Sequence, residues 1–308
     1  MMVIVNISGG LGNQMFQYAY SKLLEENKRE VLLCKRDLQC PSWNRLSPKN
    51  AQNKFYNENY HLHGYFLKDI FEIEADFADP HDLKKYSSNN IKNVLLSKLG
   101  CRTPKTISEK DFSAENLHGY AHTDVDNAFV VGYWQQLSLY EKISNTLRQS
   151  FTFKKTLSEK NQETAFKIAT TNSVSIHVRR GDFLKHPQLY PCLDASYYAD
   201  AAKIISSHTS DTNYFCFSDE TEWCKKNLPF QNITYVDWNL GRDNYVDMQL
   251  MSLCKHNIIA NSTFSAWAAW INSNPDKIVV CPSIFTYGSG DCEIHNFLPQ
   301  SWIRLHIQ

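Results

Sequence analysis

Residues 173–183 read SVSIHVRRGDF, and this stretch decides the fold of the second half of the chain. Its first six residues are small or β-branched for the most part, which is typical of a buried strand. Two arginines, a glycine and an aspartate follow directly. Because open α/β sheets bind ligands at the carboxyl ends of their strands, we expect Arg179 and Arg180 to offer rigid cationic forks to a phosphate. The alternative is an ordinary surface ion pair between Arg179 and Asp182.

Strand-like and helix-like segments alternate regularly around this stretch. Helices are predicted near 158–170, 195–207, 220–227, 243–256 and 264–272, and strands at 173–178, 214–217, 233–236, 257–260 and 277–281. Strands that alternate with helices in this way form a parallel, doubly wound sheet. Asp194 and Asp243 stand where the N-caps of two of these helices are expected.

The first half of the chain begins with its own strand, loop and helix. The β-branched residues 2–7 precede the glycine loop, and apolar residues follow at helical spacing from Met15. Residues 31–34 and 129–134 are predicted to be further strands. The polar stretch 35–125 is expected to form short helices and long loops. The fold class predicted from both halves is α/β.

The length of 308 residues exceeds what one hydrophobic core usually supports. We therefore expect two domains, at 1–155 and 156–308, joined near the polar segment 154–160. The chain has 32 lysines and arginines and 32 aspartates and glutamates, so its formal net charge is zero. No overall positive charge therefore attracts nucleic acid or an anionic membrane. Any anion site must be local.

The nine cysteines are odd in number, widely spread and free of any Cys-x-x-Cys pair. This pattern argues against a disulfide framework and against a zinc ribbon, and it indicates a reducing compartment. The start of the chain lacks a basic region, and no segment reaches 18 apolar residues. We expect a cytoplasmic protein without a transmembrane segment, for which peripheral association with the inner membrane stays open.

Polar clusters follow several predicted strands, and helix capping alone could explain each of them. Their members are Ser218, Asp219, Asn261, Ser262, Thr263 and Ser265. In a parallel sheet, however, all of them share one edge with the arginines. Arginine forks, hydroxyls and a helix N-terminus together predict a site for the diphosphate of a nucleotide. Asp219 or Asp247 could then accept hydrogen bonds from the base or ribose, although Asp247 would also suit the first turn of a helix.

The glycine loop contains Gly10, Gly12 and Asn13, but Met15 replaces the third glycine of a dinucleotide motif and no P-loop lysine follows. A loop of this kind suits close approach of the backbone to a charged or sugar ligand. Asp124 and Asp126 resemble the Asp-x-Asp motif of metal-dependent glycosyltransferases, but they fall in a polar turn. We interpret them as surface residues and expect no metal.

Three motifs resemble the α-1,2-fucosyltransferases of glycosyltransferase family 11. They are GGLGNQMFQYA at 9–19, HVRRGDF at 177–183, and DMQLMS at 247–252 with IIANSTFSAWAAW at 258–270. The resemblance runs from the first predicted strand to the last. It implies a GT-B architecture, in which two Rossmann-like domains face each other across a cleft.

The resemblance also implies the reaction: an inverting, metal-independent transfer of fucose from GDP-fucose to the 2-hydroxyl of a galactoside acceptor. The second domain would hold the donor and the first would hold the acceptor. The candidate catalytic residues would be Arg179, which would bind the β-phosphate, and Asn13, which would approach the donor from the first domain. Arg180 would contribute to donor binding. His177 and Asp247 would lie near the guanosine. The hydroxyls closing on the phosphates would be those of Ser262, Thr263 and Ser265.

The sequence identifies no general base for the acceptor hydroxyl. Asp182 is expected to orient the arginines, and His61 or His63 are open alternatives. Residues 133–135, Tyr-Trp-Gln, are expected either to stack on a galactose or to pack in the core. Two other functions are also compatible with these motifs: a different nucleotide-sugar transferase or hydrolase with the same diphosphate site, and a non-enzymatic module that binds glycans.

Overall fold

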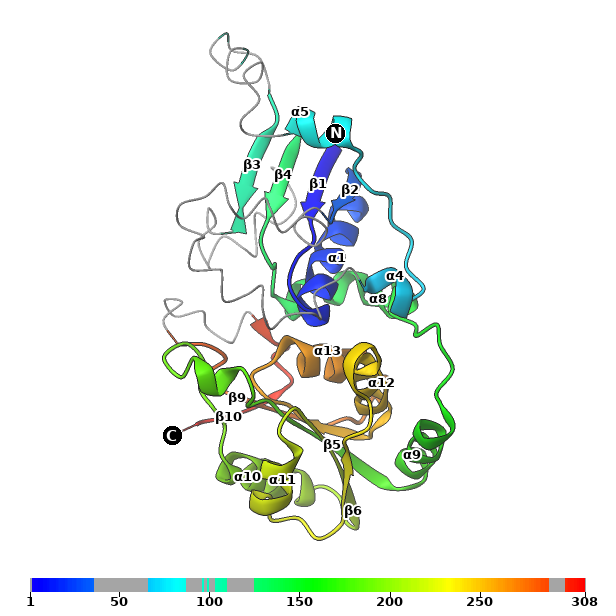
Figure 1. Cartoon of the computed structure of the whole chain (residues 1–308), viewed down its shortest axis with the longest axis vertical. Coiled ribbons are helices and arrows are strands. Elements are labelled where there is room, and N and C mark those ends of the chain that lie inside the picture. Colours follow the sequence, from blue (N-terminus) through cyan, green and yellow to red (C-terminus); the bar gives the residue numbers. More distant parts are fainter. Residues whose placement is uncertain are drawn as a thin grey trace. The chain divides into compact units, whose positions relative to one another are not determined.

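The computed structural model describes residues 2–35, 66–86, 96, 99, 103–109, 125–287 and 297–307. The chain divides into two compact units, Met1–Lys154 and Lys155–Gln308. Each unit contains one parallel sheet and its helices, and Figure 1 shows the first in blue to green and the second in green to red. The predicted α/β class is confirmed.

The first unit is built on a four-stranded parallel sheet with the order β2-β1-β4-β3. The strands are β1 (Met2–Asn6), β2 (Glu30–Cys34), β3 (Lys105–Ser108) and β4 (Ala128–Val131). Val3, Ile4 and Val5 of the central strand β1 have no exposed surface. The sequence did not predict β3, and the strand expected at 129–134 ends at Val131.

The first helix of the first unit is α1 (Leu11–Glu26). It starts four residues before Met15, the first apolar residue from which a helix was predicted. The others are α4 (Leu67–Ile70), α5 (Pro80–Tyr86), the 3-10 helix η4 (Leu137–Ile143) and α8 (Ser144–Ser150). The aromatic side chains of α1 pack inward, and Tyr20 stacks on Trp134 with ring centroids 4.1 Å apart. These contacts hold the loop after β4 against α1.

The second unit contains a six-stranded parallel sheet with the order β10-β9-β8-β5-β6-β7. Its strands are β5 (Asn172–Val178), β6 (Thr212–Ser218), β7 (Ile233–Val236), β8 (His256–Ile258), β9 (Val279–Pro282) and β10 (Ile303–Leu305). Five of them were predicted. The short edge strand β10 was missed, because its three half-buried residues carry little periodicity.

The helices of the second unit lie close to their predicted positions. They are α9 (Glu159–Thr170), α10 (Ala195–Ser206), α11 (Thr221–Asn227), α12 (Tyr245–Leu253) and α13 (Thr263–Ile271), with the 3-10 turns η5 (Phe183–Lys185) and η6 (Gly241–Asp243). Asp194 is the N-cap of α10, as predicted, and accepts hydrogen bonds from two backbone N–H groups. The same prediction for Asp243 is wrong, because α12 begins after Asn244 and Asp243 belongs to the preceding turn.

None of the helices within the described residues is long and apolar enough to cross a membrane. The cysteines within that part of the chain are free thiols: Cys34, Cys192, Cys216, Cys224, Cys254 and Cys281. Cys40, Cys101 and Cys292 lie outside the described residues. Within the described residues, the cysteines therefore form no disulfide framework.

Candidate functional site

The central feature of the second unit is the point where its strand order reverses. β5 is followed along the chain by β6 on one side, whereas β8 pairs with β5 on the other side. Open α/β sheets bind ligands at such a switch point, beyond the carboxyl ends of the strands. The register pairs Val178 with Ser218 and Ile176 with Ile258, so the segments from Arg179, Asp219 and Asn261 leave the sheet together.

Arg179 lies at this edge with its guanidinium held between two carboxylates. Its Nη2 is 2.8 Å from Oδ1 of Asp182, and its Nη1 is 3.0 Å from Oδ2 of Asp219. About one third of the side chain remains exposed. The two aspartates fix the planar fork in one orientation while leaving part of it open to an incoming anion. Of the sequence alternatives, the structure contains the ion pair with Asp182, and it adds Asp219 as a second partner.

Asp219 also binds the backbone that carries the arginines. Its Oδ1 accepts a hydrogen bond from the Arg180 N–H at 3.0 Å. A Cβ atom on Gly181 would lie 2.9 Å from the other carboxylate oxygen of Asp219, which is closer than real side chains approach. Gly181 is therefore required for close packing of the two loops and not for an unusual backbone angle.

Arg180 points to different partners from its neighbour. Its Nη1 donates to the Leu193 carbonyl at 3.2 Å, and its guanidinium carbon lies 3.9 Å from the centre of the Trp223 ring. Stacking on tryptophan stabilises a cation even when it is partly desolvated. In the structure this arginine packs the loops, and a phosphate contact from it stays a prediction.

His177 is on β5, two residues before Arg179, and it is almost fully buried. Burial, together with the positive charge of Arg179, lowers the pKa of its imidazole to about 3. The ring is therefore neutral at physiological pH. Its centroid is 5.8 Å from that of Phe264, in the first turn of α13, and its Nδ1 has no hydrogen-bond partner among the described residues.

The start of α13 contributes free backbone N–H groups on the other side of the switch point. Ser262 is the N-cap and accepts a hydrogen bond from the Phe264 N–H at 3.3 Å. Thr263 is half-buried at the first helical position. Ser265 is fully buried, and its hydroxyl donates to the backbone carbonyls of Ser262 at 3.3 Å and Ala260 at 3.5 Å. Ser262 and Thr263 are thus the accessible hydroxyls of this predicted cluster.

Asn261 is buried and joins three loops at this edge. Its Nδ2 donates to the carbonyls of Pro191 at 2.9 Å and Phe285 at 3.0 Å, which follow β5 and β9. Ser218 also has a local role, because its Oγ accepts the Glu220 N–H at 2.9 Å. The capping explanation therefore holds for Ser218, and the structure gives the Asn261 amide a positioning role.

Asp247 lies in the first turn of α12 and is half-buried. Its Oδ1 accepts a hydrogen bond from Nδ2 of Asn239 at 2.8 Å. Burial raises the pKa of this carboxyl to about 7, and the hydrogen bond from Asn239 opposes that rise. Asp247 can therefore change its charge near neutral pH.

In the first unit, the glycine loop after β1 makes its sharp turn at Gly9, which has a φ of +75°. A Cβ there would lie 2.8 Å from Nδ2 of Asn13. Gly10 is the extended N-cap of α1, and Gly12 is buried in its first turn. The backbone of this loop therefore requires glycine at position 9. The sequence analysis had named Gly10 and Gly12 instead.

Asn13 faces the loop that follows β4, and its Oδ1 accepts a hydrogen bond from Nε2 of Gln135 at 2.9 Å. Gln17, which the sequence analysis did not use, connects the same two loops: it accepts the Ser8 N–H and donates to the Gly132 carbonyl, both at 2.8 Å. A glutamine among the apolar and aromatic residues of the predicted helix is the signal that could have found it.

Glu109 is a second residue that the sequence did not identify, because the strand before it was not predicted. Its two carboxylate oxygens accept the backbone N–H groups of Tyr133 at 2.7 Å and Trp134 at 2.9 Å. Trp134 has a φ of +56° and is buried, so core packing was the correct alternative for it. Tyr133 is 41% exposed.

Other candidates from the sequence have structural roles or lie outside the described residues. Asp126 pairs with Arg29. Asp124, His61 and His63 are outside the described residues. Asp79, His81 and Asp82 place potential ligand atoms within 4.8 Å of one another, but Asp79 and Asp82 form a reciprocal capping box before and within α5.

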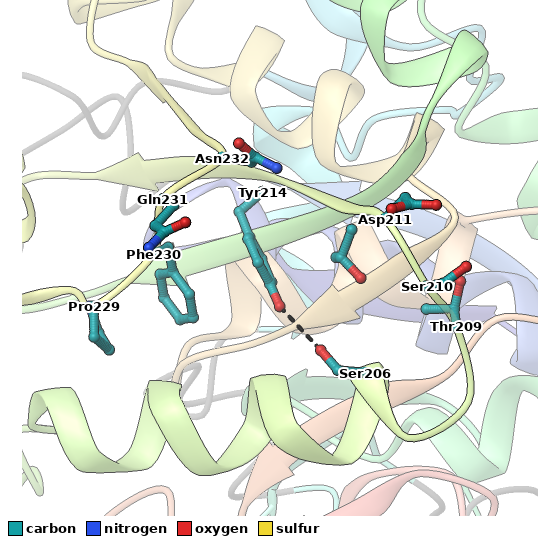
Figure 2. Close-up of a pocket in the computed structure, with 10 residues that line it drawn as sticks. Ser206, Thr209, Ser210, Asp211, Tyr214, Pro229, Phe230, Gln231 and Asn232 are labelled. Carbon is teal, nitrogen blue, oxygen red and sulfur yellow. Dashed lines mark hydrogen bonds between the residues drawn. The ribbon is translucent and has the colours of Figure 1, made fainter.

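A shallow pocket lies at the opposite edge of the second sheet, beside the amino end of β6. Figure 2 shows Tyr214 pointing toward Ser206, with their hydroxyl oxygens 3.4 Å apart, and Phe230 beside it. The two rings stack with centroids 4.4 Å apart. Since this pocket is at the amino ends of the strands, it is separate from the cluster around Arg179.

Comparison with known proteins shows similarity to glycosyltransferases over most of the chain. The family model described as Glycosyl transferase family 11 matches residues 105–303. An Escherichia coli alpha-1,2-colitosyltransferase is 29% identical over 99% of both chains. The Escherichia coli O-antigen biosynthesis glycosyltransferase WbnK is 30% identical over 97% of this chain and 99% of its own. Human galactoside alpha-(1,2)-fucosyltransferase 1 is 24% identical over 58% of this chain and 52% of its own.

Among solved structures, fucosyltransferase NodZ from Bradyrhizobium matches with a TM-score of 0.51 at 12% identity, covering 87% of this chain and 90% of that one. A NodZ alpha-1,6-fucosyltransferase co-crystallised with GDP matches with a TM-score of 0.50, covering 87% and 91%. At this identity the likeness shows the fold, and it confirms the predicted GT-B type. The family model and the near-complete alignment with WbnK show that the chain belongs to glycosyltransferase family 11.

Proposed function

We propose that this glycosyltransferase moves L-fucose from GDP-fucose to the 2-hydroxyl of a terminal galactoside, with inversion at the sugar carbon and without a metal ion. The product would be an α-1,2-linked glycan in surface polysaccharide synthesis. The observation that supports this proposal best is the orientation of Arg179 between Asp182 and Asp219 at the switch point of the second sheet. The names of two relatives, an alpha-1,2-colitosyltransferase and a galactoside alpha-(1,2)-fucosyltransferase, support an α-1,2 linkage, and the second supports fucose as the transferred sugar.

The donor would bind to the second unit, Lys155–Gln308. In this proposal Arg179 contacts the β-phosphate, and the free N–H groups at the start of α13 contact the same diphosphate, with Ser262 and Thr263 beside them. The neutral His177 and the carboxyl of Asp247 serve the guanosine. Five other predicted residues would support donor binding indirectly, because each side chain already hydrogen-bonds to the protein: Arg180, Ser218, Asp219, Asn261 and Ser265.

Cleavage of the bond between fucose and phosphate builds negative charge on GDP and positive charge on the sugar ring. A cation fixed at the β-phosphate interacts more strongly as that charge grows, so it lowers the barrier as well as the binding energy. Asp182 and Asp219 hold the guanidinium in place beforehand, which avoids reorganisation during the reaction. Their contacts with Arg179 make them positioning residues.

The acceptor would bind to the first unit, Met1–Lys154, at the carboxyl edge of its sheet. There Asn13 and Gln135 present paired amides, and the half-exposed ring of Tyr133 stands on a loop that Glu109 holds. An aromatic face beside amide groups suits a neutral sugar. We further propose that the reaction takes place in the cytoplasm and requires no nucleic acid partner.

Transfer of colitose is the second candidate, and one observation favours it. The alignment with the alpha-1,2-colitosyltransferase covers 99% of both chains. Colitose lacks one hydroxyl of fucose, so the diphosphate chemistry described above would serve both sugars unchanged. A pocket built to bind a sugar hydroxyl discriminates strongly against the analogue that lacks it. Competition between GDP-fucose and GDP-colitose therefore decides between the two donors.

The test is incubation of the purified chain with GDP-fucose, alone and with a panel of β-galactosides. The proposal expects release of GDP that depends on the acceptor and a product whose fucose is α-linked to the 2-hydroxyl of galactose by NMR. Equal release of GDP without an acceptor indicates a hydrolase. Sugar binding without affinity for GDP indicates a glycan-binding module, and either result overturns the proposal.

A further inference from the structure

A network of buried amide side chains leads to Asp247 from two other elements of the second unit. Asn161 comes from α9, and Asn239 comes from the loop after β7. Both side chains are more than nine-tenths buried. α9 packs against α12, which carries Asp247. Two amides so fully removed from water need defined partners, because an unpaired buried polar group destabilises the fold.

The amide groups of this network satisfy one another. Nδ2 of Asn161 donates to Oδ1 of Asn239 at 2.8 Å, and Nδ2 of Asn239 donates back to Oδ1 of Asn161 at 3.1 Å. Oδ1 of Asn161 also accepts the indole N–H of Trp238 at 2.8 Å. The reciprocal pair fixes which way each amide faces. The remaining hydrogen of Asn239 Nδ2 is thereby directed to Oδ1 of Asp247, at 2.8 Å.

The network ends at Asp247, whose two carboxyl oxygens have different surroundings. Oδ1 is bound by Asn239, whereas Oδ2 has no hydrogen bond to any residue within the described part of the chain. The side chain is half-buried, so one edge of the carboxyl stays accessible. A carboxylate with one oxygen fixed and the other free is oriented to accept an N–H donor from a ligand.

We propose that Asn239, held by Asn161, is a positioning residue that keeps the carboxyl of Asp247 aimed at the N–H donors of the donor's purine base, and thereby sets the base selectivity of the enzyme. This inference rests on the proposed function, because it needs a nucleotide at this site. A purine with adjacent N–H groups, as guanine has, matches the carboxylate. Adenine and uracil offer a different pattern of donors and acceptors and would bind less well.

The electrostatic surroundings of Asp247 give this proposal a distinctive pH dependence. α12 carries no other charged residue, and α13 carries none. α9 carries Glu159, Lys160, Glu163 and Lys167, and Nζ of Lys160 lies 3.8 Å from the centre of the Trp238 ring. Arg242 and Asp243 in the turn before α12 are exposed, and the Cys216 thiol on β6 interacts electrostatically with Asp247.

Asn239 makes the interaction that favours the charged form of Asp247, against the effect of burial. With the pKa of Asp247 raised to about 7, the carboxylate is present above that pH and is lost as the pH falls through it. Removing the Asn239 amide raises this pKa further. A variant without the Asn239 amide should therefore lose GDP affinity at neutral pH and regain it at higher pH. If the substitution only displaced the loop, GDP binding would be weakened equally at all pH values.

The experiment measures GDP affinity of the full chain by titration calorimetry from pH 6 to pH 9, for the wild type and Asn239→Ala. We expect GDP binding of the variant to be about tenfold weaker at pH 7, with a smaller loss at pH 9, and selectivity for GDP over ADP to fall. Asn161→Ala should shift the profile in the same direction. If Asn239→Ala does not fold, Asn239→Ser, whose hydroxyl is too short to reach Asp247, replaces it.

Asn272→Ala is the matched control. Asn272 and Asn257 form an equally buried amide pair in the same unit, at 2.8 Å, without a hydrogen bond to Asp247. This variant should lose comparable thermal stability and keep the wild-type pH profile. In the Asp247→Asn background, Asn239→Ala should change GDP affinity no further.

Two outcomes separate the inference from the proposed function. If the wild type has no affinity for GDP at any pH, the proposed donor is wrong. If the wild type binds GDP but Asn239→Ala has the wild-type pH profile and the wild-type preference over ADP, the positioning role of Asn239 is wrong while the donor stands.

Discussion

Arg179 and Asp219 are the first residues after two neighbouring strands whose last residues, Val178 and Ser218, pair in register. Their side chains meet at 3.0 Å. The alignment of β5 with β6 thus brings the cation and its carboxylate partner together without a long loop. Because strand register is fixed by the buried faces of the sheet, the backbone positions of Arg179 and Asp219 are fixed relative to each other.

Gly181→Ala should disturb this arrangement without disturbing the core. The added methyl group would lie 2.9 Å from a carboxylate oxygen of Asp219 and must displace it from Arg179. We expect kcat to fall about tenfold, while the thermal midpoint changes little. Asp219→Asn provides the comparison, since it weakens the same ion pair directly. The double variant should be no worse than the more damaged single variant, and additive losses would contradict the shared cause.

Glu109→Gln tests the acceptor face of the first unit. Glutamine has one acceptor oxygen in place of two, so one of the backbone N–H groups of Tyr133 and Trp134 loses its partner. The exposed ring of Tyr133 should become less well fixed, and KM for the galactoside should rise several-fold with GDP affinity unchanged. Tyr133→Ala should act in the same direction and Tyr133→Phe much less. A rise in KM for GDP-fucose alone would refute this assignment.

Removal of divalent cations should leave the transfer rate unchanged. Arg179 and the N-terminus of α13 supply positive charge at the diphosphate in the proposed mechanism. The rate is measured after dialysis against EDTA, and again after Mn²⁺ or Mg²⁺ is added. Activity that disappears with EDTA and returns with a metal would contradict the arginine-based account.

The sequence predicted the second unit more accurately than the first for physical reasons. Its inner strands β5, β8 and β9 are almost fully buried, and helices of ordinary length separate the strands, so the two kinds of segment alternate clearly along the sequence. In the first unit, β3 has two exposed and two half-buried residues, and it pairs with β4 only at the edge of the sheet. Such a strand carries no pattern that distinguishes it from a loop.

The sequence indicated which residues belong to the candidate site, but it did not indicate which of them contact one another. The positions of Arg179, Asp182 and Asp219 after strands followed from the sequence, yet no pattern indicated that Arg180 would stack on Trp223 instead of joining its neighbour. The network of Asn161 and Asn239 was also missed, because isolated asparagines in polar segments look like surface residues until their burial is known.

The central claim is that Arg179 stabilises the leaving diphosphate, and kcat for fucose transfer by Arg179 variants tests it most directly. Lysine keeps the charge but lacks the planar fork that both aspartates hold, so Arg179→Lys should retain little activity. Arg179→Ala should lose about 10²–10³-fold in kcat, with a loss in GDP-fucose affinity no larger than that. Circular dichroism should show a native fold, since little apolar area is lost. Transfer by natively folded Arg179→Ala at nearly the wild-type rate would contradict the account.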